Sequence, residues 1–268
     1  MGRILLSVLM ATGLIVSLTA QSSMADSWSI FGRHNERGSG DVATEERAVG
    51  AFERIRLVGV ADVRITIGDS CHVKVSTDDN LLDNIVTEIT GRRTLVIDNE
   101  GSFSTSRGVQ VEITMPTLSL VEADGSGDVE IVGLKSESLE IELGGSGTVD
   151  FDGEVKQLDI SIGGSGGVTS HDLKAEDVRI ETNGSGDVEL RGSARNLECA
   201  VHGSGDIEAS HLQTERAGAQ VYGSGDISVY ATIAFDGAIY GSGDIDLFGN
   251  PDEIDRHVAG SGDIRRRR

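Results

Sequence analysis

The sequence has little of several residue types, and each shortage excludes a class of protein. It holds two prolines against 36 glycines, which excludes collagen, because a collagen chain needs abundant proline in a three-residue period. Its 23 Lys and Arg residues stand against 44 Asp and Glu residues, which gives a formal net charge of -21. Binding to nucleic acid needs clustered basic side chains, so this charge balance disfavours nucleic acid as a partner. An anionic membrane surface is disfavoured for the same reason, unless divalent cations bridge the charges.

Long apolar runs are also missing after the first residues of the chain. Arg3 and the apolar run from Ile4 to Leu18 have the pattern of a secretory signal, and small residues around Ala20 and Ala25 resemble cleavage sites. We expect residues 1–25 to be a signal peptide; the alternative, an uncleaved anchor helix, is disfavoured because the run is short for a bilayer. No cysteine lies near the cleavage sites, which disfavours a lipid anchor. The mature chain is therefore expected to be exported, periplasmic or at the cell surface, without a transmembrane segment.

What the chain has in abundance is the tripeptide Gly-Ser-Gly. From Gly125 onward it starts eight times at steps of 20, 19, 20, 19, 20, 18 and 19 residues, and Asp follows it six times. A fixed period near 20 residues is typical of repeat proteins in which each unit is one supersecondary turn. Apolar and charged residues alternate on both sides of each tripeptide, as in Val129-Glu130-Ile131 and Leu139-Glu140-Ile141. This alternation predicts two short strands per unit.

Strands this short are not stable alone, so each is expected to pair with its copy in the next unit. The sequence therefore predicts an all-β fold, a parallel β-helix (β-solenoid) with about 19–20 residues per coil. A β-propeller is disfavoured, because a blade needs about 40 residues. About eleven coils stacked about 4.8 Å apart would form a rod of roughly 50 Å.

We expect one solenoid domain over residues 46–264, with less regular coils over 46–117 and Gly-Ser-Gly repeats over 118–264. Residues 26–45 are polar and are predicted to be a flexible N-terminal segment, although they contain an out-of-phase Gly-Ser-Gly-Asp copy. Residues 265–268 form a basic tail. Within the less regular coils, Asn80 to Thr90 is predicted to form either a short helix or a further strand pair.

The chain has only two cysteines, Cys71 and Cys199. They are 128 residues apart in sequence, or about six coils, which places them on the order of 30 Å apart along the axis at the usual strand spacing. A disulfide needs Cα atoms within roughly 7 Å of each other. We therefore expect both to be small core residues rather than a disulfide pair.

An N-terminal motif and the ladder of repeats together resemble a known bacterial family. The residues that carry the resemblance are Phe52-Glu53-Arg54-Ile55, Gly59-Val60-Ala61-Asp62-Val63-Arg64-Ile65, Asp79-Asn80-Leu81-Leu82, Leu95-Val96-Ile97 and the Gly-Ser-Gly-Asp-Val/Ile ladder. Over about residues 38–264 the chain is similar to the family described as putative auto-transporter adhesin, head GIN domain. The resemblance implies a right-handed parallel β-helix, shaped like pectin lyases but without a known catalytic set. It also implies a role in the cell envelope or in adhesion.

The Asp that follows the tripeptide is the first candidate site. Stacked coils would align Asp187, Asp206, Asp226 and Asp244 in one column. Charges about 4.8 Å apart in water repel by about 0.9 kcal/mol, so the column needs compensation. In one alternative, each carboxylate caps its turn by accepting hydrogen bonds from Ser hydroxyls and backbone N–H groups. In the other, Ca²⁺ lies between the coils, since this cation prefers oxygen ligands; it is the only cofactor that the sequence suggests.

The residue before the tripeptide is the second candidate site. Alternation predicts that Asn183, His202, Tyr222 and Tyr240 face outward in one column, beside small residues such as Ala200 and Ala238. Such a flat face suits an extended glycan or peptide, with aromatic rings that offer stacking area and a polar tip. The alternative is a structural ladder in which like residues stack between coils without binding anything.

Catalysis is the third possibility. Solenoid lyases and hydrolases act with clustered carboxylates on one face. The outward carboxylates here recur too regularly to single out a pair, and no long loop after Leu118 interrupts the repeats, although catalytic groups usually stand on such loops. No phosphate loop, nucleophile motif or zinc spacing occurs. A polysaccharide-acting lyase or hydrolase is therefore the alternative to our main prediction.

The main prediction is a non-enzymatic cell-envelope protein that binds a glycan or a protein on a flat solenoid face. Its oligomeric state is left open. For the arginine tail we weigh two interpretations: charges that guard the open end of the solenoid against stacking, or a tail that docks on an acidic partner.

Overall fold

The computed structural model describes residues 35–267, so the predicted signal peptide lies outside the described part. The N-terminal part contains β1 (Asn35–Arg37), β2 (Val42–Arg47), β3 (Arg54–Leu57), β4 (Asp62–Ile67), β5 (His72–Asp78), the 3₁₀ helix η1 (Asp79–Asn84), β6 (Ile85–Thr90), the 3₁₀ helix η2 (Gly91–Arg93), β7 (Thr94–Asn99), β8 (Ser102–Ser104) and β9 (Gln110–Met115). The repeat region contains β10 (Leu120–Ala123), β11 (Val129–Leu143), β12 (Thr148–Ile162), β13 (Gly167–Thr182), β14 (Val188–Val201), β15 (Ile207–Val221), β16 (Ile227–Ile239), β17 (Ile245–Gly249), β18 (Glu253–Val258) and β19 (Ile264–Arg266). Neither 3₁₀ helix has the length or apolar character that a membrane crossing requires.

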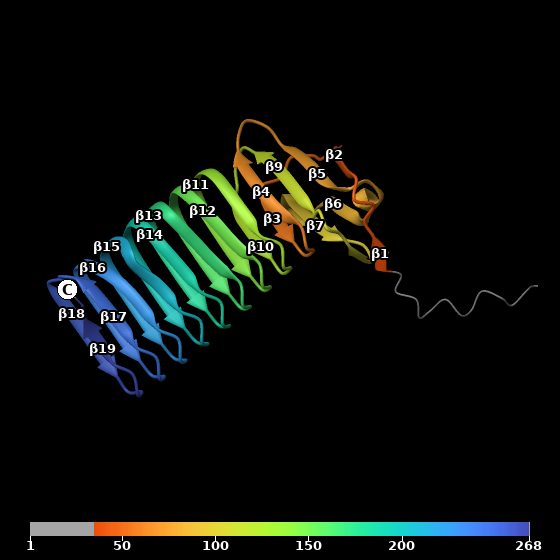
Figure 1. The fold of residues 1–268 in the computed structure, drawn as a ribbon. Coiled ribbons are helices and arrows are strands. Elements are labelled where there is room, and N and C mark those ends of the chain that lie inside the picture. Colours follow the sequence, from red (N-terminus) through yellow and green to blue (C-terminus); the bar gives the residue numbers. More distant parts are fainter. Residues whose placement is uncertain (1–34, 268) are drawn as a thin grey trace, which may run out of the picture. The chain divides into compact units, whose positions relative to one another are not determined.

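The repeat region is a parallel β-solenoid, which confirms the predicted fold class (Figure 1). Each strand from β11 to β16 pairs in parallel with the next, and equivalent residues align, as in Val129, Val149 and Val168. The solenoid makes about seven turns rather than the eleven that we expected. The difference arises because most residues before the repeats form other kinds of pairing.

Each regular coil is one bent strand, where we expected two short ones. Strand β11 is continuous over 15 residues, and its register with β12 shifts only between Ile131 and Leu134. Gly133 lies in that interval with φ +74°, a backbone conformation that favours glycine. The strand turns the corner there without losing its pairing to the next coil.

The core runs through the coils as rows of aligned apolar side chains. In β11, Val129, Ile131, Leu139 and Ile141 are each at most 2 % exposed, whereas the intervening charged residues face solvent. The period-two alternation therefore sorts inward from outward positions in every coil.

An irregular coil precedes the first repeat. Strand β3 pairs in parallel with β10, and β4 pairs in parallel with β11. Between them, Gly59-Val60-Ala61 stands where the later coils have Gly-Ser-Gly. It is stacked directly on the first tripeptide, since an added Cβ at Gly125 would meet the carbonyl oxygen of Gly59. On its other side this coil pairs in parallel with β7 and β9, which come later in the sequence. Spatial order and chain order therefore differ in this region.

Strands β1 and β8 pair with each other in parallel, whereas the pairings of β2, β5 and β6 are antiparallel. Strand β5 pairs with both β2 and β9, and β6 pairs with β7. Residues 80–90 combine the two alternatives that we weighed, since η1 is followed directly by β6. The region 46–117 therefore combines the irregular coil of β3 and β4 with antiparallel strands of the same sheet, rather than a series of coils.

Residues 35–47, which the sequence suggested would belong mainly to a flexible segment, carry β1 and β2. The out-of-phase Gly-Ser-Gly-Asp copy lies between these strands and folds around the buried carboxylate of Asp78. The backbone N–H of Gly40 donates to Asp78 Oδ1 at 2.6 Å, and the Thr105 hydroxyl donates to Oδ2. These bonds, that of Thr105 above all, hold the pKa of Asp78 below its ordinary value. The polar segment is thus ordered by a buried charge that needs donors.

Both cysteines are free: Cys199 is buried in the core and Cys71 is half-buried. Burial raises the pKa of the Cys199 thiol, so this side chain is an inert core residue rather than a reactive thiol.

Candidate binding face

The aspartate column is built as a ladder of hydrogen bonds between coils. Asp187 Oδ1 accepts a bond from the backbone N–H of Asp206 at 2.8 Å. The same bond runs from Asp226 to Asp206 at 2.8 Å and from Asp244 to Asp226 at 2.7 Å. The structure therefore brings all four predicted residues together. Each carboxylate caps the backbone of the next coil, rather than groups in its own turn as the capping alternative proposed.

The same bond recurs in the first coils at Asp128, which follows the first tripeptide, and at Asp62, which the tripeptide pattern missed. The N–H of Asp128 donates to Asp62 Oδ1 at 3.2 Å, and the N–H of Thr148 donates to Asp128 Oδ1 at 2.9 Å. Asp62 follows Gly59-Val60-Ala61, so a search for Gly-Ser-Gly alone overlooks it. The looser pattern of Gly followed three residues later by Asp would have found it.

The calcium alternative has no geometric support from side-chain clusters. Among residues 35–267, no group of three or more His, Cys, Asp or Glu side chains is arranged to hold a metal ion. Calcium binding by the aspartate column remains a prediction that a melting experiment can test.

The predicted aromatic column is a stack of rings. The ring centroids of His202 and Tyr222 lie 4.7 Å apart with planes 2° from parallel, and those of Tyr222 and Tyr240 lie 5.1 Å apart with planes at 12°. We call these three residues the aromatic ladder. Tyr222 and Tyr240 are 44 % and 49 % exposed, so the ladder stands on the surface.

A fourth ring, which the sequence column did not include, extends the ladder. His257 lies 5.6 Å from Tyr240, with its plane tilted by 49°. The strict column continues from Tyr240 to Ala259, whereas His257 pairs with Ala238, two positions earlier on the same outward face. Following that neighbouring column would have found it.

Asn183 joins the ladder through a carboxylate rather than by stacking. Its amide donates to Glu181 Oε1 at 3.2 Å, and His202 Nε2 lies 3.9 Å from the same oxygen. At the next coil, the Tyr222 hydroxyl donates to Gln220 at 2.8 Å. All four predicted face residues therefore lie on one surface with linked polar groups.

The geometry of the stack changes what the rings can offer a ligand. Parallel rings about 5 Å apart cover each other's faces, so they present their edges and polar tips to solvent. The stacking area that we expected for a ligand is used within the ladder itself. What remains is a row of imidazole nitrogens and phenol oxygens beside the small side chains of the neighbouring column.

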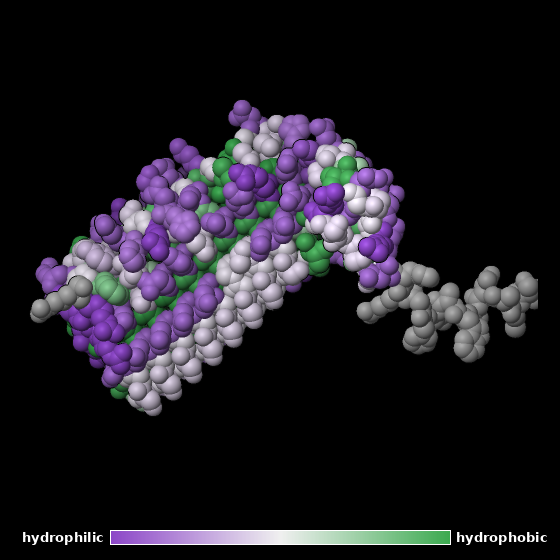
Figure 2. Space-filling model, in the orientation of Figure 1, coloured by the Kyte–Doolittle hydropathy of each residue, from purple (hydrophilic) through white to green (hydrophobic). Residues whose placement is uncertain are grey.

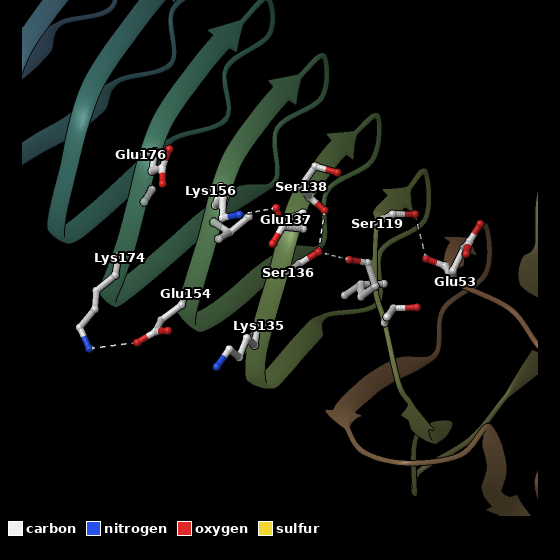
Figure 3. A pocket seen from close by; sticks show the side chains of 14 residues that line it. Glu53, Ser119, Lys135, Ser136, Glu137, Ser138, Glu154, Lys156, Lys174 and Glu176 are labelled. Atoms are coloured by element: carbon white, nitrogen blue, oxygen red, sulfur yellow. Dashed lines mark hydrogen bonds and ion pairs between the residues drawn. The ribbon is translucent and has the colours of Figure 1, made fainter.

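A separate groove of about 640 Å³ lies over β11, β12 and β13, and our sequence analysis did not single it out. Figure 3 shows lysines and glutamates alternating across it: Lys156 Nζ lies 2.5 Å from Glu137 Oε2, and Lys174 Nζ lies 3.6 Å from Glu154 Oε1. The hydrogen bond with Glu137 raises the pKa of Lys156 above its ordinary value. Lys and Glu alternating at the coil period was the available signal.

The basic tail lies on the last coil. Arg265 Nη1 lies 2.7 Å from Asp244 Oδ2, its Nη2 lies 3.0 Å from Asp263 Oδ2, and Arg267 Nε lies 2.9 Å from Asp246 Oδ2. The tail therefore neutralises the end of the aspartate ladder within its own chain.

Along one edge of the molecule the turns form a smooth ridge of nearly neutral hydropathy, visible in Figure 2. The outer Ser of each turn is exposed, whereas the second Gly is buried. These features define the class of the protein. It is a parallel β-solenoid in which each coil contributes one side chain to each outward column.

Within that class, the chain belongs to the family described as putative auto-transporter adhesin, head GIN domain, whose sequence profile matches residues 51–171 and 154–251. This confirms the suspected resemblance. No curated protein matches the chain in sequence.

Solved structures of similar proteins agree with the fold. A putative lipid binding protein from Parabacteroides distasonis is 29% identical, with a TM-score of 0.82 over 87% of this chain and 100% of its own. A putative adhesin from Bacteroides fragilis is 26% identical, with a TM-score of 0.66 over 86% and 99%. A putative adhesin from Parabacteroides merdae, 22% identical with a TM-score of 0.80 over 87% and 99%, shares the fold.

Proposed function

We propose that the protein is a non-enzymatic, exported binding module of the cell envelope, and that it holds a glycan or protein partner on the face of the aromatic ladder. The observation that carries this proposal is the exposed stack of His202, Tyr222 and Tyr240 beside a column of small residues. Stacking already fixes the positions of the rings, so a partner that binds them loses little further side-chain entropy. The row of polar tips is therefore preorganised for an extended partner.

The family and its solved relatives support an adhesive role. Two of the relatives named above are described as putative adhesins, and one as a putative lipid binding protein. The family membership and the signal pattern at the start of the sequence both support export to the periplasm or the cell surface.

The alternative of a polysaccharide lyase or hydrolase finds less support. Such an enzyme needs a carboxylate or lysine free to exchange a proton in a groove. Three of the four glutamates that line the groove of Figure 3 are ion-paired: Glu137 and Glu154 with lysines, and Glu53 with Arg93. Glu176 and Lys135 form no ion pair with residues 35–267, but no loop sets them apart from the repeats. Turnover on a panel of acidic polysaccharides would overturn the non-enzymatic proposal.

The proposal is tested by replacing Tyr222 and Tyr240 together with Phe. These substitutions keep the stacked rings and remove both hydroxyls. Binding of the mature chain to a glycan array and to envelope extracts should weaken, while the urea midpoint should stay the same. Tyr230→Phe is the matched control, because Tyr230 is the one other tyrosine of the chain and lies outside the ladder. If the double variant and the control bind alike, the ladder is only structural.

A further inference from the structure

A cavity of about 690 Å³ lies at the last coil of the solenoid, beside β16, β17 and β19 (Figure 1). The register aligns Tyr230 with Phe248 and Leu247 with Arg266, so three successive coils contribute to it. Ligand sites in proteins are usually clefts of about 300–1,000 Å³, so the cavity has room for a small organic molecule. Its lining consists of Tyr230, Gly249, Asn250, Arg266 and Arg267.

The charge of this cavity is opposite to that of the whole molecule. Its lining holds two arginines and no carboxylate. Four other cavities in the described part of the chain, of about 230–640 Å³, are each lined by at least two carboxylates. Because the chain has a net charge of -21, those four cavities repel an anion, whereas the arginines of this one attract it.

Arg266 supplies a positive charge that no carboxylate of residues 35–267 neutralises. Its Nη2 donates to the carbonyl oxygen of Gly249 at 3.4 Å and to Oδ1 of Asn250, and both acceptors are neutral. These two bonds hold the guanidinium at the cavity. They leave the N–H groups of Nε and Nη1 for a ligand.

Arg267 adds a fork of donors to the same cavity. Its Nε lies 2.9 Å from Asp246 Oδ2, so one side of the guanidinium is used within the chain. Nη1 and Nη2 lie side by side and can donate to both oxygens of one carboxylate, as arginine does in bidentate pairs. Asp246 offsets only one of the two positive charges, and the neighbouring Asp244 and Asp263 already pair with Arg265. The cavity therefore retains a positive charge.

The two remaining side chains of the lining suit a sugar. Tyr230 is half-buried, and among residues 35–267 no aromatic ring stacks on it, in contrast to Tyr222 and Tyr240. Such a ring can pack against the apolar face of a sugar. Asn250 is exposed, and its Oδ1 accepts from Arg266, so its amide N–H groups are left to bind sugar hydroxyls. A carboxylate, an apolar face and hydroxyl groups occur together in a uronic acid.

We propose that this cavity binds a uronic acid unit of an acidic polysaccharide. The carboxylate lies between Arg266 and Arg267, the sugar ring packs on Tyr230, and Asn250 binds a hydroxyl group. The site shares no residue with the aromatic ladder and goes beyond the proposed function, because it holds a glycan whether or not the ladder binds a partner. No carboxylate lines the cavity to exchange a proton, so we expect binding rather than cleavage.

The probe is oligogalacturonate, titrated by calorimetry against the full mature chain at low salt, with its methyl ester as the uncharged counterpart. The oligomer should bind and the ester should not, because only the free acid carries carboxylates. Arg266→Gln with Arg267→Gln should weaken the binding about ten-fold or more. Arg191→Gln with Arg216→Gln is the control, since it removes the same charge from two exposed arginines on other coils. It should change the binding by less than about two-fold.

A second pair of variants tests the contact with the sugar ring. Tyr230→Ala should weaken the binding of oligogalacturonate about five-fold or more. Tyr230→Phe keeps the ring and should bind as the unmodified chain does. An unchanged urea midpoint shows that each variant is folded.

Several outcomes would overturn the proposal: no binding of the oligomer, equal binding of the ester, or equal weakening in the two double arginine variants. If inorganic phosphate displaces the oligomer at a lower concentration than monomeric galacturonate does, the cavity is a general anion site and the sugar assignment is wrong. Loss of binding when Tyr222 and Tyr240 become Phe, with no effect of the Arg266 and Arg267 variant, would place the polysaccharide on the aromatic ladder. That result overturns this site and supports the proposed function, so the two proposals can fail separately.

Discussion

The second glycine of each turn occupies a position where no side chain fits. At Gly205 an added Cβ would lie 2.0 Å from the carbonyl oxygen of Gly186 in the preceding coil. The obstacle is the backbone of Gly186, so it cannot move aside as a flexible side chain would. Close stacking of the coils, rather than a positive φ, is the reason for glycine at this position.

Gly205→Ala should therefore destabilise the protein by at least about 3 kcal/mol, because the coils must separate to admit the methyl group. The free energy of unfolding from urea titration measures this. Gly91→Ala is the control, since nothing lies within 4 Å of the Cβ it would add. A small effect at Gly205 would mean that the coils are more loosely stacked than described.

Glu198 carries a charge that the folded state disfavours. Its pKa is raised first by burial and then by Asp236, so the folded protein binds a proton more readily than the unfolded chain. The ionised carboxylate therefore costs stability above the raised pKa. Below the ordinary carboxyl pKa the group is protonated in both states, and the cost disappears.

Glu198→Gln should accordingly stabilise the protein at neutral pH. Solvent screening at this partly exposed position limits the gain to about 0.5 kcal/mol. The gain should fade as the pH falls through the raised pKa of Glu198 and vanish below the ordinary carboxyl range. Urea unfolding at neutral and acidic pH measures whether the variant is more stable than the unmodified chain, with Asp159→Asn as the control. A gain that persists in acid would contradict the assignment.

Among the elements, the aspartate ladder joins coils through bonds that a sheet does not otherwise provide. Each bond satisfies one backbone N–H at a turn, where the strand pairing is interrupted. An Asn side chain has a carbonyl oxygen that can accept the same bond without the negative charge. An Asn at this position should therefore preserve the capping bond but remove the charge that calcium binding needs.

Asp226→Asn should change the free energy of unfolding by less than about 0.5 kcal/mol, whereas Asp226→Ala should cost about 1 kcal/mol because the N–H of Asp244 loses its acceptor. The melting temperature of the unmodified chain should be the same in calcium and in chelator. A calcium-dependent rise that Asp226→Asn abolishes would establish the metal site instead.

At the scale of the whole molecule, the two ends of the solenoid differ. The first repeat is covered by the β3 and β4 coil, and that coil by β7 and β9. At the last coil, Ile254 and Val258 are 39 % and 48 % exposed. Between them Arg256 aligns with the buried Gly237, which gives it an inward position, and it reaches the carbonyl oxygen of Ile264 at 3.5 Å. An inward charge at an open edge discourages the addition of further strands.

Arg256→Leu should therefore promote end-to-end association, since it completes an apolar end on an unpaired strand. Analytical sedimentation at increasing protein concentration should show larger species than for the unmodified chain. Arg195→Leu, an exposed position in the middle of the solenoid, is the control. An unchanged sedimentation profile would show that Arg256 does not prevent end-to-end association.

The sequence by itself determined the repeat architecture. The Gly-Ser-Gly period and the alternation around Val129 and Leu139 are local signals, and every coil repeats them, so fold class, inward rows and the columns of Asp226 and Tyr222 could all be predicted. The family resemblance was recognisable from the same residues.

Only the tertiary structure decided how the irregular parts are paired and how the columns are used. The coil of β3 and β4 lies between the repeats and the later strands β7 and β9, an order that no local pattern encodes because it depends on contacts between distant segments. Whether the rings of Tyr222 and Tyr240 stack or stand open depends on the coil spacing and on side-chain rotamers, which periodicity does not specify. The placement of the Glu198 carboxylate over Gly218 and the inward position of Arg256 likewise depend on the neighbouring coils, so only the tertiary structure shows them.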